Sequence, residues 1–95
     1  MKMIKEKVKI SNQSTRNKIT GGYIRLGNIQ SKFNMKSTVK NAKYAYSKMG
    51  ELKSEFEQMV IAKSQDFDKE DKEKLVKQID DSMKRLSKDW PEVLE

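Results

Sequence analysis

The hydrophobic positions between Ser37 and Val60 recur every three or four residues. They are Ala42, Tyr46, Met49, Leu52, Phe56, Met59 and Val60. This spacing places side chains on one stripe of an α-helix, and most of the positions between them are lysine, glutamate or glutamine. The pattern predicts an amphipathic helix over residues 37–63, whose apolar stripe is covered by another part of the chain or by a partner.

A first helix is predicted at residues 12–32. Polar capping residues at 11–15 precede it, and apolar side chains follow at helical spacing. Gly21 and Gly22 lie inside this segment, and two glycines in a helix cost about 2 kcal/mol relative to alanine. For residues 17–26 the alternative is therefore a β-hairpin that turns at the two glycines.

The segments on either side of this first helix are short. Residues 33–37 read as a turn, with Ser37 or Thr38 as the N-cap of the next helix, which makes the first two helices antiparallel neighbours. Residues 1–10 alternate weakly between apolar and basic side chains. They are expected to form a basic N-terminal arm, the alternative being a short strand.

A third periodic stripe follows a charged stretch. Its members are Leu75, Val76, Ile79, Met83, Leu86 and Trp90. Either a turn at 64–68 precedes a third helix at 69–90 that is capped by Asp68, or one long helix continues from the second. Pro91 ends this helix. The expected fold class is all-α: an antiparallel helical hairpin or a three-helix bundle, in one small domain of residues 1–95.

Composition removes several function classes. The chain has 95 residues, which allow one small core, and it contains neither cysteine nor histidine. Disulfides, thiolate metal sites and the commonest catalytic base are thereby excluded, so we expect a non-enzymatic protein without a cofactor. No run approaches the length of a membrane span, and no secretion signal is recognisable at the start. The expected location is the cytoplasm, or export without a cleavable signal peptide.

The net charge of +7 is unevenly distributed. Residues 1–50 hold a single acidic residue and a net charge of +11, which leaves −4 for residues 51–95. This asymmetry can attract an anionic partner to the first half, or it can draw the two halves together within the fold. Candidate contacts to an anion or a nucleic acid are Arg16, Lys18, Arg25, Lys32, Lys36, Lys40 and Lys43. A basic nucleic-acid-binding accessory protein is accordingly the alternative function.

The layout resembles one family of small helical proteins. A β-like lead (Lys7-Val8-Lys9-Ile10), a first helix rich in Ser and Thr, a turn and a long second helix are similar to the WXG100-like partner proteins of LXG toxins, in Gram-positive type VII secretion. The run Phe67-Asp68-Lys69-Glu70-Asp71 has the aromatic-xxx-acidic form of the export element of that family, whereas the turn lacks Trp-x-Gly. The resemblance implies a helical hairpin that binds the N-terminal helical domain of a toxin and completes its export signal.

The stripe of the central helix has more apolar side chains than a short first helix can cover. A homodimer or a complex with a helical partner protein is therefore expected, unless a third helix covers the stripe within the same chain. Candidate partner-binding residues are Tyr46, Met49, Leu52, Phe56, Met59, Phe67 and Asp71.

Overall fold

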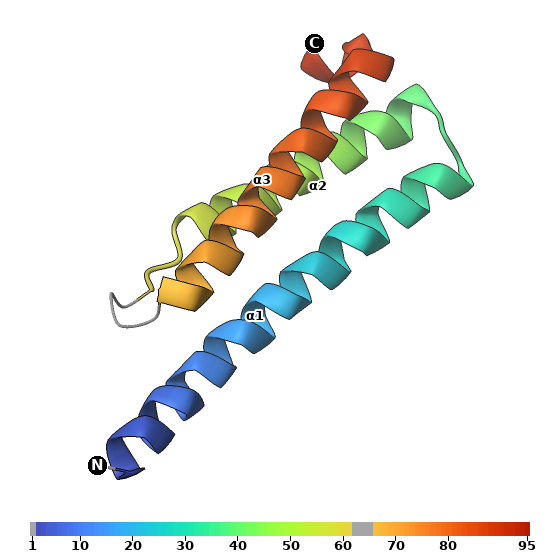
Figure 1. The fold of residues 1–95 in the computed structure, drawn as a ribbon. Helices are drawn as coiled ribbons and strands as arrows, with labels where there is room; N and C mark the ends of the chain where they lie inside the picture. Colours follow the sequence, from blue (N-terminus) through green and yellow to red (C-terminus); the bar gives the residue numbers. More distant parts are fainter. Residues whose placement is uncertain (1, 62–65) are drawn as a thin grey trace.

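The computed structural model describes the backbone of residues 2–61 and 66–95 and the side chains of residues 14–61 and 68–95. This part of the chain contains three α-helices, one short 3-10 helix and no strand (Figure 1). The elements are α1 (Lys2–Met35), α2 (Val39–Glu57), α3 (Asp66–Asp89) and η1 (Pro91–Leu94). The predicted all-α class is confirmed, and of the two expected architectures the chain adopts the three-helix bundle.

Helix α1 is longer than the sequence pattern predicted. It begins at Lys2 rather than near residue 12, so residues 2–10 continue the helix and the strand alternative is wrong. It also continues through Gly21 and Gly22, which rules out the hairpin alternative for residues 17–26. A helix of 34 residues is about 50 Å long, close to the 56 Å long dimension of the molecule. Its N-terminal end projects past the other two helices (Figure 1).

The start of α2 follows the expected capping chemistry. Thr38 is in extended backbone conformation, and its side-chain oxygen accepts a hydrogen bond from the backbone N–H of Asn41 at 3.1 Å. This bond satisfies one of the N–H groups that have no partner within the first turn of a helix. The turn before it is held by the Asn41 side-chain amide, which donates to the carbonyl of Lys36 at 2.8 Å.

Helix α2 ends at Glu57, six residues before the predicted end at 63. The backbone N–H of Gln58 still donates to the carbonyl of Ser54, and the N–H of Met59 then closes a tighter turn on the carbonyl of Phe56. The chain leaves the helix at this point, so the alternative of one continuous helix is wrong. The predicted turn at 64–68 falls partly on residues 62–65, which lie outside the described part.

Helix α3 begins at Asp66, three residues before the predicted start at 69. Asp68 is therefore its third residue and not its N-cap. A carboxylate in the first turn is favoured there by the helix dipole. At the other end the helix stops at Asp89, and Pro91 opens η1, as expected of a residue that cannot continue a helix.

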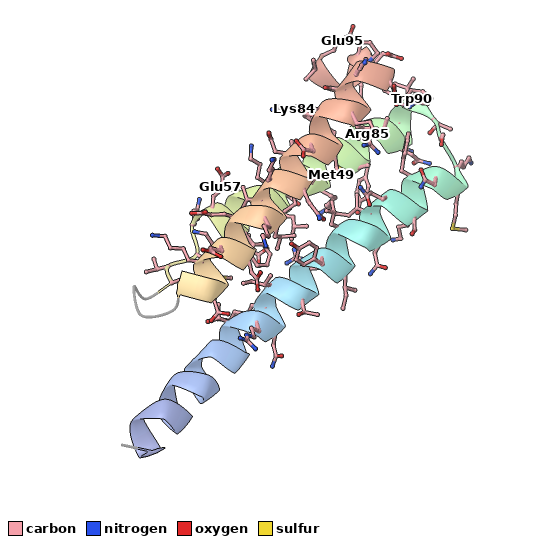
Figure 2. The ribbon with its side chains drawn as sticks, in the orientation of Figure 1. Met49, Glu57, Lys84, Arg85, Trp90 and Glu95 are labelled. Atoms are coloured by element: carbon pink, nitrogen blue, oxygen red, sulfur yellow. The ribbon has the colours of Figure 1, made fainter. Side chains whose placement is uncertain are left out.

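The core lies where the three helices meet. Figure 2 shows that side chains fill the space between the ribbons, with Met49 at the centre. Of the side chains that the structure describes, ten hydrophobic ones are buried, each at most 7% exposed: Ile19, Leu26, Ala42, Ala45, Met49, Leu52, Phe56, Leu75, Ile79 and Leu86. Helix α3 thus folds back and covers the apolar stripe of α2 within the same chain. The stripe therefore needs neither a second copy of the chain nor a partner to cover it, contrary to the expectation of a dimer or a partner complex on this ground.

The two halves of the chain also attract each other inside the fold. The Arg25 guanidinium lies 2.9 Å from the Glu55 carboxylate, and the Nε of Arg16 lies 3.5 Å from the carboxylate of Asp68. Both pairs join the basic first half to the acidic second half, one of the two outcomes expected from the charge asymmetry.

A pH-dependent contribution to stability is expected from Asp80. Hydrogen bonds from Lys53 and Lys84, at 2.9 and 3.0 Å, hold the pKa of this carboxyl below its ordinary value. A carboxyl with a lowered pKa in the folded state stabilises the fold above the pKa that it has when unfolded, and this contribution is lost as the pH falls through the folded pKa.

We therefore expect the free energy of unfolding to fall less steeply in Asp80→Asn than in the parent protein between about pH 5 and about pH 2. Urea unfolding followed by circular dichroism at several pH values measures this slope. The matched control is Asp81→Asn, at the adjacent exposed carboxylate, for which the described residues provide no ion pair; it should keep the parental slope. Parallel pH profiles for Asp80→Asn and the parent protein would contradict the assignment.

Candidate binding groove between α1 and α2

A groove of about 620 Å³ lies between the C-terminal half of α1 and the N-terminal half of α2. On α1 it runs from Arg25 to Met35, and on α2 from Asn41 to Glu51, which is about 15 Å along each helix. No residue of α3 lines it. The groove therefore lies on the side of the α1–α2 hairpin that α3 leaves uncovered.

The floor of the groove is apolar. It is formed by Ile29 and Phe33, one turn apart on α1, and by the buried Ala45 on α2. The Phe33 ring meets Trp90 edge-on, with ring centroids 5.8 Å apart and an interplanar angle of 86°. Trp90 directly follows α3 and precedes η1 (Figure 2), so the C-terminal segment of the chain packs against the floor of the groove.

The rim of the groove has two large exposed side chains. Tyr44 on α2 is 58% exposed, and Met35 at the end of α1 is 87% exposed. Lys48 lies one turn after Tyr44 on α2, and its ammonium is 5.5 Å from the centroid of the Tyr44 ring. An apolar floor with an exposed aromatic ring beside it is typical of a surface that binds another molecule.

The charges around the groove are mostly positive. Its cations are Arg25, Lys32 and Lys48, and its acidic residue is Glu51. Glu51 pairs with Lys48 at 3.2 Å, and Arg25 pairs with Glu55. Lys32 has no ion pair among the described residues, so its charge is available to an anionic partner.

The predicted partner-binding residues do not form this groove. Met49, Leu52 and Phe56 are at most 3% exposed in the core, and Tyr46 and Met59 pack against it half-buried. The three buried side chains are closed to a partner unless the bundle opens, whereas part of Tyr46 and of Met59 remains accessible. The sequence pattern identifies the apolar stripe of α2, but not which segment of the chain covers it.

The predicted export element lies at the start of α3. Asp71 is half-buried, and its charge, together with burial, raises the pKa of Tyr23 on α1, with burial as the larger cause. The side chain of Phe67 lies outside the described part of the chain. The element is thus on a helix that packs back on the hairpin, not near the end of the second helix as the family resemblance implies.

The candidate anion-binding residues are only partly brought together. Arg25 and Lys32 line the groove, and Arg16 faces Asp68. The remaining members lie outside the groove lining: Lys18, Lys36, Lys40 and Lys43. The structure adds Lys48 and the exposed Tyr44. These two, with Asn41, Ala45 and Glu51, form a second stripe at helical spacing on α2, next to the core stripe, and this stripe could have been found from the sequence.

Asp68 is the one buried charged residue in the described part of the chain. It is 0% exposed, and neither of its carboxylate oxygens has a hydrogen-bond partner there. The Nε of Arg16 at 3.5 Å supplies an electrostatic contact without hydrogen-bond geometry. Burying a carboxylate in this way is costly, and the charge of Arg16 and the dipole of α3 offset part of the cost. The pair thus ties the middle of α1 to the start of α3.

Among the described residues, no group of three or more acidic side chains is arranged to hold a metal ion. In the described part of the chain, none of the helices has both the length and the apolar character that crossing a membrane requires. No protein-family model matches the chain, and no curated protein or solved structure is significantly similar to it.

Proposed function

We propose that this protein is a non-enzymatic helical binding protein that takes an α-helix of a partner protein into the groove between α1 and α2. The observation that supports the proposal most strongly is the apolar floor of Ile29, Phe33 and Ala45, on the side that α3 leaves uncovered. Two adjacent helices form a natural cradle for another helix, which would complete a four-helix arrangement. The exposed Tyr44 ring is suited to anchor such a helix, since tyrosine is enriched among the residues that contribute most to interfaces.

For the identity of the partner, we propose the N-terminal helical domain of a toxin exported by type VII secretion. The support is the sequence layout, together with the antiparallel α1–α2 hairpin and its short turn. The third helix and the position of Asp71 at its start depart from that family. The partner contact is accordingly proposed for the groove and not for the buried stripe.

A second candidate function is nucleic-acid binding. It is favoured by one specific observation: the exposed Tyr44 ring lies among the cations Arg25, Lys32 and Lys48. Aromatic rings stack on bases, while cations hold phosphates. Phe33 is less suited to stacking, because it is half-buried and its ring is engaged by Trp90.

The proposal is tested by co-expressing the protein with the helical domain encoded by its neighbouring gene. We expect a 1:1 complex in light scattering, because the groove accommodates one helix. Tyr44→Ala should weaken binding by about tenfold or more, as expected for an aromatic anchor. The matched control is Ile24→Ala, because Ile24 on α1 is 59% exposed, like Tyr44, but does not line the groove.

Two results would contradict the proposal: a protein that stays monomeric beside its neighbour, or equal binding by the two variants. The salt dependence of binding distinguishes the second candidate function from the first. Binding of a single-stranded oligonucleotide should weaken steeply between about 0.05 and 0.2 M salt, whereas a helix seated on an apolar floor should respond only modestly.

A further inference from the structure

We infer that the helix accepted by this groove is acidic, with carboxylates on both sides of an apolar stripe about three turns long. The inference rests on the proposed function and adds the chemistry of the partner. The length follows from the groove, which spans residues 25–35 of α1 and 41–51 of α2. The carboxylates follow from the cations on its two sides.

Both helices contribute cations to the groove. Arg25 and Lys32 are two turns apart on α1, and Lys48 lies across from them on α2. A helix lying between them would have positive charge on each of its flanks. An apolar stripe on the partner would then meet the floor, while carboxylates three or four residues away from the stripe would meet the cations.

Arg25 and Lys48 each pair with a carboxylate of the chain, and a carboxylate of a partner can take its place. In the Arg25–Glu55 pair the side chains are 54% and 55% exposed, and in the Lys48–Glu51 pair they are 43% and 64% exposed. Exposed pairs of this kind contribute little to stability. A carboxylate from a partner can therefore replace either acid at small cost. Lys32 needs no exchange, since the described residues offer it no carboxylate.

The end of the groove is held in a fixed shape. Ser37 donates to the carbonyl of Phe33 at 3.1 Å, and Asn41 donates to the carbonyl of Lys36, so the turn between α1 and α2 is tied to both helices. Lys32 and Tyr44 are thereby placed at this end before any partner binds. Preorganisation of this kind lowers the entropic cost of binding.

A protein helix fits these features better than a nucleic acid or a lipid surface. A single-stranded nucleic acid is typically held by stacking on several exposed aromatic faces in succession, and here only Tyr44 offers an exposed one within the groove. A lipid surface needs a protruding apolar face, whereas Ile29, Phe33 and Ala45 line a hollow.

Synthetic helical peptides test the inference. One peptide has a leucine stripe flanked by glutamates, and a second has glutamine in place of each glutamate. Fluorescence anisotropy at about 0.15 M salt measures their binding to the full chain. We expect the glutamate peptide to bind about tenfold more tightly. Lys32→Glu should remove most of this difference by replacing attraction with repulsion.

The matched control is Lys77→Glu, an exposed lysine on α3 that has no ion pair among the described residues and lies outside the groove. It changes the net charge by the same amount and should leave the preference for the glutamate peptide intact. Equal binding of the two peptides would overturn the inference while leaving a helix-binding groove in place. Binding of neither peptide would overturn the proposed function as well. Tighter binding of a single-stranded oligonucleotide or an anionic vesicle, abolished by Lys32→Glu, would overturn both in favour of that ligand.

Discussion

Replacing Phe56 by alanine should lower the free energy of unfolding by about 3–5 kcal/mol. The Phe56 side chain is 2% exposed on α2, and its ring lies directly opposite Gly22 of α1. The side chain of Leu75 on α3 reaches the same glycine, so this ring lies where the three helices meet. Its removal leaves a cavity that all three helices would have to close together.

The effect is large compared with the total stability expected of a small domain, about 5–15 kcal/mol. Urea unfolding followed by far-UV circular dichroism measures it, as a shift of the midpoint. Tyr44→Ala is the control, because that ring is 58% exposed and its removal should change stability by no more than about 0.5 kcal/mol. If Phe56→Ala unfolded at the parental midpoint, the position of Phe56 in the core would be wrong.

The second large effect concerns two adjacent glycines, at which replacement by alanine should change the stability in opposite directions. Gly21→Ala should stabilise the protein by about 0.5–1 kcal/mol, the usual gain from alanine inside a helix. A Cβ at position 21 would meet no atom within 4 Å. Gly22→Ala gains the same helix propensity, but its Cβ would lie 2.6 Å from atoms of both Phe56 and Leu75. Such overpacking costs about 1–3 kcal/mol, so the net effect is destabilising.

Thermal and urea unfolding of the two variants measure this contrast. Gly27→Ala is a further control in α1, because it too has open space around its Cβ. The mechanism is tested by combining Gly22→Ala with Phe56→Leu, which shortens the obstructing side chain and should reduce the cost of the alanine. Stabilisation by both Gly21→Ala and Gly22→Ala would mean that the helices are farther apart at this point.

The all-α class and the approximate helix positions were predictable from local chemistry. The spacing of Met49, Leu52 and Phe56 identifies a helix with a buried stripe, and these three side chains are indeed in the core. The cap at Thr38 and the stop at Pro91 depend on single residues whose backbone preferences are strong. Gly22 has no side chain, and the Phe56 and Leu75 side chains come close to it for that reason.

The binding groove was much less predictable. Arg25 and Lys32 were among the candidate residues, whereas the floor at Ile29, Phe33 and Ala45 requires two helices to be placed side by side at one particular rotation. The periodicity of one helix indicates which of its faces is apolar. It does not indicate the angle at which a neighbour lies, and the shape of a groove depends on that angle.

The sequence by itself therefore determined the helices, the core stripe and the charge difference between the two halves of the chain, because each depends on residues near one another in sequence or on composition. Only the tertiary structure decided that α3 covers the stripe of α2 within the chain, that Asp68 is buried beside Arg16, and that one side of the α1–α2 hairpin remains open. An apolar stripe gains the same free energy from burial against its own chain as against a partner. The choice depends on where the chain reverses direction after α2, and no local pattern specifies that.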